Sequence, residues 1–200
     1  SNNTALGRYS LTNNISGSGN TAAGANSLPS NTTGTYNVGI GVQSLEQNTT
    51  GGQNTAIGVA AIDRNTTGSN NAILGAFAGR YISGGSVYNT LINQSVLIGA
   101  ETKPLADNGT NEIVIGYNAV GNGSHTIQLG NTSITNVKTS GTITAGTVTY
   151  PNAHNTTAGQ VLTTDASGVA SWSTPSTTAT AYSGILPIAN GGTGSSTQNF

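Results

Sequence analysis

Two carboxylates are spaced in a way that could support sugar-cleaving chemistry. Glu46 and Asp63 are seventeen residues apart, and Arg80 follows seventeen residues after Asp63. If seventeen residues make one turn of a solenoid, the two carboxylates stack about 5 Å apart, near the separation found in retaining glycosidases. The same row is more simply a salt-bridged surface ladder. Because the sequence supplies no cleft beside it, we favour the structural role.

Other groups suited to metal or phosphate chemistry are few. His125 and His154 are the only imidazoles, and no Cys or carboxylate pattern accompanies either of them. One His from each chain of a trimer could supply three zinc ligands, but an exposed turn position is the favoured interpretation. Asp107-Asn108-Gly109 is typical of a turn. The segment 191–194 has no Lys and no helix behind it, so it is no phosphate loop. We therefore predict no cofactor and no metal.

Aromatic residues are the better indication of a binding site. Phe77, Arg80, Tyr81 and Tyr88 gather in a segment, about residues 77–94, that interrupts an otherwise regular repeat. Sugar rings stack on aromatic faces, and Arg, Asn and Gln donate hydrogen bonds to hydroxyl groups. We expect these four residues to contact a saccharide. The structural alternative is that the rings fill gaps in an oligomer or cap the fold.

Composition limits the classes of function. Gly, Thr, Asn and Ser make up 107 of the 200 residues, and only 6% are charged, against about 25–35% on the surface of an ordinary soluble domain. Five basic residues cannot form the patch that nucleic acid or an anionic membrane requires. The chain has no Cys and therefore no disulfide. Its short apolar runs exclude a membrane-inserted helix.

A period of seventeen organises the first part of the chain. One column holds Asn3, Asn20, Asn37, Asn54 and Asn71, and two further columns hold Gly. Two apolar columns run in phase with them. We expect both to form the core, which would then contain Leu6, Ile40, Ile57 and Leu74 from one column and Leu11, Leu28, Leu45 and Ile62 from the other.

The period predicts an all-β fold, a parallel β-solenoid or β-roll with two short strands in each coil. The Asn residues would form hydrogen-bonded turns, and the Gly residues would adopt positive φ or allow close backbone approach. Side chains alternate along a strand. If the Leu6 column points inward, the small residues before it (Ala22, Gly39 and Ala56) point outward and leave room for another chain.

The repeat weakens after residue 75 and defines four regions. Residues 1–130 contain the β-roll repeats, with the insertion at about 77–94 and a loop at 101–111. Residues 131–154 form a β-rich, stalk-like connector. Residues 155–184 contain a small β-hairpin and a linker, and residues 185–200 form a Gly-rich end.

Some of these motifs resemble known fibrous proteins. Asn54-Thr55-Ala56-Ile57-Gly58 and Ile113-Val114-Ile115-Gly116 resemble the head repeats of trimeric autotransporter adhesins. The later segments 142–151, 159–165 and 186–194 resemble bacteriophage tail-fibre proteins and similar bacterial trimeric fibres. The resemblance implies a left-handed β-roll that forms a homotrimer, followed by β-rich fibre modules, and the period of this chain gives the roll seventeen-residue coils. Low charge suits parallel chains, since like charges would meet around a three-fold axis.

We therefore expect a non-enzymatic, homotrimeric fibre segment that acts in adhesion or host-cell receptor recognition. It would be an extracellular part of a phage tail or a bacterial surface fibre. Its partners would be itself and a cell-surface glycan or outer-membrane component of a host or prey cell, with no nucleic acid and no membrane insertion. The alternatives are a purely structural shaft, a polysaccharide depolymerase using Glu46 and Asp63, and an ice-binding solenoid using the Thr pairs at 32–33, 49–50 and 66–67.

Overall fold

A computed structural model describes residues 2–138, 140, 143–145, 148–150, 159–167 and 169–174. The described residues form strands and turns, with no helix among them, and none of them belongs to a segment that could cross a membrane as a helix. The chain divides into two compact units, residues 1–135 and 136–200. The strands are β1 (Thr4–Leu6), β2 (Thr21–Ala23), β3 (Val38–Ile40), β4 (Thr55–Ile57), β5 (Ala72–Leu74), β6 (Ile92–Asn93), β7 (Val96–Ile98), β8 (Gly109–Thr110), β9 (Ile113–Ile115), β10 (Ile127–Leu129), β11 (Ile143–Ala145), β12 (Val148–Tyr150), β13 (Val161–Thr164) and β14 (Ala170–Ser173).

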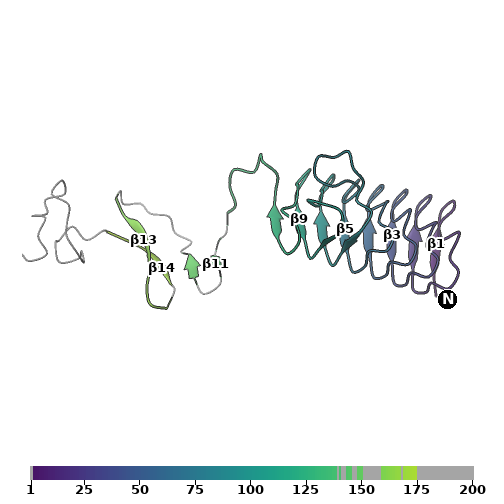
Figure 1. Cartoon of the computed structure of the whole chain (residues 1–200), viewed down its shortest axis with the longest axis horizontal. Coiled ribbons are helices and arrows are strands. Elements are labelled where there is room, and N and C mark those ends of the chain that lie inside the picture. The colour runs from purple at the N-terminus through teal and green to yellow at the C-terminus, as the bar shows by residue number, and fades with distance from the viewer. Residues whose placement is uncertain are drawn as a thin grey trace, which may run out of the picture. The chain divides into compact units, whose positions relative to one another are not determined.

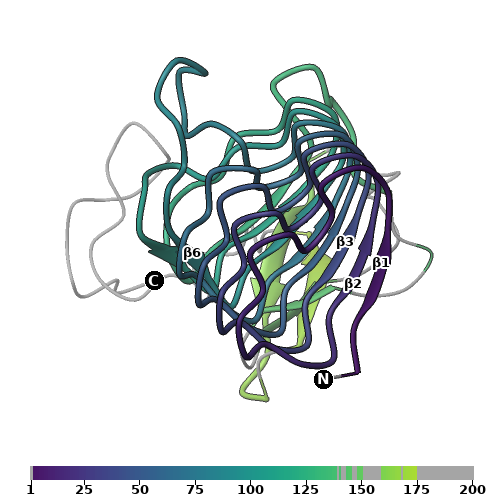
Figure 2. The ribbon, with the colours of Figure 1, turned by 90° about the vertical axis from the view of Figure 1, so that its right-hand side faces the viewer.

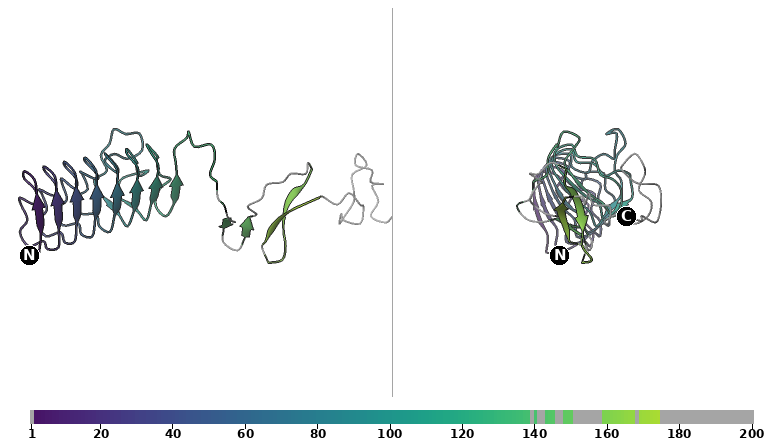
Figure 3. Two further views of the ribbon diagram at one scale, coloured as in Figure 1. Left: turned by 180° about the vertical axis from the view of Figure 1, so that it is seen from behind. Right: turned by 90° about the vertical axis from the view of Figure 1, so that its left-hand side faces the viewer.

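The first unit is a parallel β-solenoid of about seven turns, seen from two sides in Figures 1 and 3. Each coil contributes one strand to a sheet of order β1-β2-β3-β4-β5-β7-β9-β10. Paired residues are seventeen apart from β1 to β5, as in Thr4 with Thr21. The spacing is 24 between Ala72 and Val96 and 14 between Ile113 and Ile127. The predicted parallel solenoid and its period are confirmed, and the coils superimpose when viewed along the stack (Figure 2).

The second predicted strand of each coil is mostly a turn. Among the described residues, the column of this second strand has one isolated parallel bridge, between Lys103 and Val120, and the strand pair β6–β8 lies elsewhere in the coil, just before β7 and β9. Residues 101–111, expected to be a loop, consist mostly of turns and bends and contain the two-residue strand β8. The second apolar column adopts left-handed backbone conformations, with φ from 37° to 52° at Leu11, Leu28, Leu45 and Ile62. Leu28, Leu45 and Ile62 are fully buried and Leu11 packs against them, so this column does form core.

The first predicted core column points the wrong way. Leu6, Ile40 and Leu74 are 72%, 41% and 48% exposed, and Ile57 is half-buried. From β2 onward, the middle residue of each strand in the solenoid sheet faces inward in place of the expected one. Ala22, Ala56 and Ile73, the middle residues of β2, β4 and β5, are accordingly buried. Our strand phase was therefore wrong by one residue, and a one-residue shift exchanges every side chain between the two faces.

Side-chain volume explains this phase. The Leu column reaches across the interior and leaves room only for small residues on the strand. A Cβ on Gly39 would lie 2.7 Å from the Oγ atoms of Ser27 and Ser44 and 3.2 Å from Leu28 Cδ1. Gly79 occupies the next position of the Leu column after Ile62. There the buried side chain of Leu97, from the strand side, fills the space that a Leu would take. Large and small residues thus complement one another across the core, as close packing requires.

Buried asparagines hold successive coils together. The Oδ1 atom of Asn20 accepts the backbone N–H of Asn37 at 2.9 Å, and Asn37 accepts that of Asn54 at 3.0 Å. Their Nδ2 groups donate to carbonyl oxygens of the Gly34 column. A second ladder runs from Asn48 to Asn31 at 2.9 Å. The predicted asparagine turns are confirmed, and they lie inside the solenoid, where unpaired amides would be costly.

The glycine column beside the sheet allows the coils to approach each other. From Gly7 to Gly75 its φ angles lie between 125° and 140°. A Cβ at Gly41 would lie 2.5 Å from the carbonyl oxygen of Gly58 in the next coil. Both the positive φ and the close backbone approach predicted for this column are confirmed.

The second unit contains two antiparallel strand pairs among its described residues. Strands β11 and β12 pair Ile143 with Tyr150, and β13 and β14 pair Leu162 with Trp172. The second pair is the predicted hairpin, and the Asp165 carboxylate accepts the N–H groups of Ser167 and Val169 in its turn, both at 2.9 Å. The predicted Gly-rich end, 185–200, and most of the linker lie outside the described residues.

Candidate functional site

The interruption of the repeat is a hairpin that lengthens one coil by seven residues, from seventeen to 24. The regular seventeen-residue spacing continues from Ile62 to Tyr81. The hydrogen bond from the Ile62 N–H to the Ala78 carbonyl of the next coil shows this. The hairpin then follows, with residues 82–87 between Tyr81 and Tyr88, which form an antiparallel bridge. The insertion is therefore shorter than the predicted 77–94, and its flanks are regular coil.

Glycines and backbone hydrogen bonds shape this hairpin. Gly84 and Gly85 turn the chain with φ of 88° and 72°, and Ile82 N–H donates to the Val87 carbonyl at 3.0 Å. Ser83 Oγ donates to the Leu105 carbonyl of the next coil at 2.6 Å. The hairpin is thereby fastened to the stack.

Tyr81 and Tyr88 stack at the base of the hairpin. Their ring centroids are 5.0 Å apart with an interplanar angle of 20°. The Arg64 guanidinium lies 4.7 Å from the Tyr88 centroid, and that of Arg80 lies 5.4 Å from the Tyr81 centroid. Hydrogen bonding to Tyr81 and Arg80 lowers the pKa of the Tyr88 phenol. Cations beside π-faces order such a cluster.

A buried carboxylate anchors the two arginines. Asp63 is fully buried, and its Oδ2 lies 3.4 Å from Arg64 Nε and 3.5 Å from Arg80 Nε. Burial raises the pKa of Asp63, and the positive charges of Arg80 and Arg64 offset only part of that effect. Asp63 and Arg80 form an ion pair as the ladder predicted, but the pair lies below the surface.

The carboxylate pair is poorly placed for glycoside hydrolysis. Asp63 is enclosed by two guanidinium groups, and Glu46 accepts a hydrogen bond from Gln43 Nε2 at 3.1 Å. A nucleophile or general acid must reach its substrate, and Asp63 is 0% exposed. The pair therefore gives no support to the depolymerase alternative.

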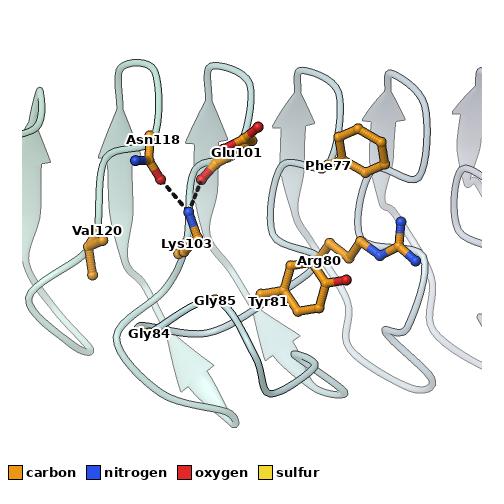
Figure 4. Close-up of a pocket in the computed structure, with 9 residues that line it drawn as sticks. All are labelled: Phe77, Arg80, Tyr81, Gly84, Gly85, Glu101, Lys103, Asn118 and Val120. Atoms are coloured by element: carbon orange, nitrogen blue, oxygen red, sulfur yellow. Dashed lines mark hydrogen bonds between the residues drawn. The ribbon is translucent and has the colours of Figure 1, made fainter.

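A pocket of about 620 Å³ lies beside the hairpin, within the range of about 300–1,000 Å³ that is usual for small-molecule sites. Figure 4 shows Phe77, Glu101 and Asn118 in a row on successive coils, with Arg80, Tyr81 and Lys103 beneath them. The complete lining is Phe77, Arg80, Tyr81, Gly84, Gly85, Glu101, Lys103, Asn118 and Val120.

Three of the four predicted binding residues line this pocket: Phe77, Arg80 and Tyr81. Tyr88 does not line it and instead supports Tyr81 from the side. Sequence reasoning missed Glu101, Lys103, Asn118 and Val120. Glu101 and Asn118 could have been found from their spacing. Glu101 follows Phe77 by the lengthened coil spacing of 24 residues, and Asn118 follows Glu101 by the regular spacing of seventeen.

The polar end of the pocket is organised by Lys103. Its Nζ donates to the Glu101 carbonyl oxygen at 3.0 Å and also to Asn118 Oδ1. Figure 4 shows both hydrogen bonds; the one to Glu101 lies within a coil, and the one to Asn118 joins two neighbouring coils. The Lys103 ammonium thus has a fixed position at this end of the pocket.

Left-handed backbone at the pocket belongs to the coil rather than to the site. Phe77, Glu101 and Asn118 have φ of 58°, 58° and 50°. Gln43 and Ala60 occupy the same position in earlier coils with φ of 60° and 50°. The conformation therefore repeats along the solenoid and is not strain confined to a functional residue.

No metal-binding group emerges from the described residues. His125 is exposed, and its Nδ1 lies 3.2 Å from Asn111 Nδ2, while His154 is outside the described residues. Within the described part of the chain, no three His, Cys, Asp or Glu side chains gather as ligands for an ion.

Comparison with protein-family models, curated proteins and solved structures finds no match to this chain. The pocket and the solenoid must therefore be interpreted from their own geometry.

Proposed function

We propose that this chain is a non-enzymatic segment of a left-handed, homotrimeric extracellular fibre that acts in adhesion or receptor recognition. Its setting would be a phage tail fibre or a bacterial surface fibre. Its partners would be two further copies of itself and a cell-surface glycan or outer-membrane component of a host or prey cell.

The observation that carries this proposal is the outer face of the solenoid sheet. Large aliphatic side chains form a column along it, and the exposed members are Leu6, Ile40, Leu74, Ile98, Ile115 and Leu129. The eight strands of this sheet contain no charged residue. Seven strand spacings give the column a length of about 34 Å. An uncharged face that carries such a column of exposed aliphatic side chains marks an interaction surface.

The composition of this face favours further copies of the same chain as its occupant. Parallel copies around a three-fold axis bring each residue close to its own equivalents. A single acidic or basic residue on the column would then meet like charges, whereas uncharged aliphatic side chains pack without that penalty. The absence of charge from every strand of the face is what such symmetry requires.

The pocket supplies the adhesive part of the proposal. It combines exposed aromatic rings with several hydrogen-bonding groups, which is the usual character of a saccharide site. Three copies in one fibre would raise a weak affinity for each site through avidity.

The other candidate functions receive less support. In the Thr pairs, Thr32 and Thr49 donate to carbonyls of the next coil, and only the second Thr of each pair is exposed. This leaves a narrow row of hydroxyls for an ice-binding face. A purely structural shaft would not need the pocket or its hairpin.

The proposal is tested by comparing association and adhesion in two charge variants. Ile40→Asp places a charge on the aliphatic face, and Thr50→Asp places the same charge at an exposed corner. The Thr50→Asp protein should remain a trimer and bind to envelopes from a panel of bacteria, whereas Ile40→Asp should become monomeric and lose most of that binding. A trimeric, fully adhesive Ile40→Asp protein would contradict the proposal, as would failure of the wild type to bind any envelope.

A further inference from the structure

The pocket has two chemically different ends. Phe77 and Tyr81 provide aromatic surface at one end, and Glu101, Lys103 and Asn118 provide polar groups at the other. We propose that it binds an uncharged sugar residue with vicinal hydroxyl groups, with the sugar's C–H face on the rings and its hydroxyls on the polar end. This inference rests on the proposed adhesive function and specifies its ligand class.

The balance of charge in the pocket favours an uncharged sugar. Arg80 and Arg64 share the Asp63 carboxylate, whose Oδ2 lies 3.5 Å from Arg80 Nε, and Glu46 adds a second negative charge that acts on this cluster, so its two cations meet two anions. The remaining ionised side chains in the lining are Lys103 and Glu101, one of each sign. A carboxylate, sulfate or phosphate on the ligand would therefore meet the Glu101 carboxylate with no surplus cation to hold it.

The hydrogen-bonding groups at the polar end match a vicinal diol. Lys103 Nζ has three N–H donors, of which two are engaged with the Glu101 carbonyl and Asn118 Oδ1. Within the part of the chain that the structure describes, the Glu101 carboxylate and Asn118 Nδ2 make no hydrogen bond. A hydroxyl can donate to the carboxylate while it and its neighbour accept from the ammonium and the amide.

The aromatic end suits the apolar face of a sugar ring. Phe77 is 38% exposed, and the Tyr81 ring is held in place by its stack with Tyr88. A rigid ring loses little conformational entropy when a ligand packs on it. The aromatic end of the pocket, which offers the sugar no directional hydrogen bonds, is thus already ordered before the ligand binds.

Two substitutions remove these features with little risk to the fold. Phe77→Ala introduces the residue that stands at the equivalent position in an earlier coil, Ala60, and Glu101→Gln likewise matches Gln43. Glu46→Gln is the matched control, since it removes a carboxylate that does not line the pocket.

The experiment measures binding of the full chain to immobilised neutral oligosaccharides of glucose, galactose, mannose and N-acetylglucosamine, and to uronic-acid and sialylated oligosaccharides. We expect binding to at least one neutral glycan, little change with added salt, and a loss of at least about tenfold in Glu101→Gln and Phe77→Ala but not in Glu46→Gln. Each variant's trimer mass is measured alongside.

Binding to acidic glycans only, weakening with salt, would overturn the assignment of an uncharged sugar while leaving the adhesive function intact. Neutral-glycan binding that survives both pocket substitutions would overturn the site. If no glycan binds but bacterial envelopes still do, the saccharide inference fails and adhesion stands. If neither glycans nor envelopes bind, both fail.

Discussion

Replacing one buried asparagine should reveal how strongly the internal ladder holds the solenoid. Asn37 Nδ2 donates to the Gly51 carbonyl at 2.8 Å, and its Oδ1 accepts the backbone N–H and the Nδ2 of Asn54, both at 3.0 Å. Asn37→Ala removes all three hydrogen bonds. Gly51 keeps a donor in Asn48 Nδ2, and Asn54 Nδ2 keeps the Gly68 carbonyl. The backbone N–H of Asn54 is left buried without its partner.

These losses set the expected magnitude. Three hydrogen bonds contribute about 1 kcal/mol each, and a buried unpaired N–H adds about 1–2 kcal/mol. We therefore expect Asn37→Ala to lower the free energy of unfolding by about 4–5 kcal/mol. Asn70→Ala is the control, because Asn70 is exposed and has the same kind of left-handed backbone that Ala60 adopts. We expect it to cost less than about 1 kcal/mol.

Urea unfolding followed by circular dichroism measures the difference between the two variants. Amide hydrogen exchange provides the local check, since the Asn54 N–H should lose protection in Asn37→Ala while amides in β9 keep theirs. Equal destabilisation by both substitutions, or unchanged protection of the Asn54 amide, would refute the reasoning that the ladder fastens the coils.

Three further substitutions test other parts of the account. Leu45→Ala should cost about 3 kcal/mol in urea unfolding, because Leu45 is fully buried and the rigid coil cannot close the cavity; a cost below about 1 kcal/mol would contradict its place in the core. Gly41→Ala should lower the free energy of unfolding by at least about 3 kcal/mol, because the new Cβ would lie 2.5 Å from the Gly58 carbonyl oxygen and the backbone φ is 125°. Near-wild-type stability of this variant would show that the coils can separate. Burial opposes ionisation of Asp107, but hydrogen bonds from Thr90 lower the pKa of Asp107 below its ordinary 3.8. The stability that the carboxylate contributes is therefore complete above about pH 4 and lost as the pH falls through the lowered pKa, so the wild type and Asp107→Ala should differ at pH 7 and converge in acid.

The sequence predicted the period, the parallel solenoid and the asparagine turns because the same columns recur in phase from Asn3 to Asn71. It did not predict which face of the strand points inward, because both candidate columns are uncharged. The deciding factor is the volume that Leu28 and Leu45 occupy from the opposite side, which leaves space only for Ala22, Gly39 and Ala56. Leu28 and Leu45 fill this volume from positions where their backbone is left-handed, a conformation that Leu rarely adopts.

The candidate site was found only where its residues broke the repeat. Phe77, Arg80 and Tyr81 stand out as aromatic and charged residues in a chain poor in both. Lys103 and Val120 could not be assigned to the site, because their approach to the hairpin depends on the path of the lengthened coil. Nor does the sequence show that Asp63 is buried beneath two guanidinium groups.

The central claim is that the aliphatic face of the solenoid is covered by two further copies of the chain. Native mass measurement of the full chain at micromolar concentration tests it most directly. With a chain mass of 19.9 kDa, the account predicts a species of about 60 kDa. A stable single-chain species with its aliphatic face open to water would contradict it.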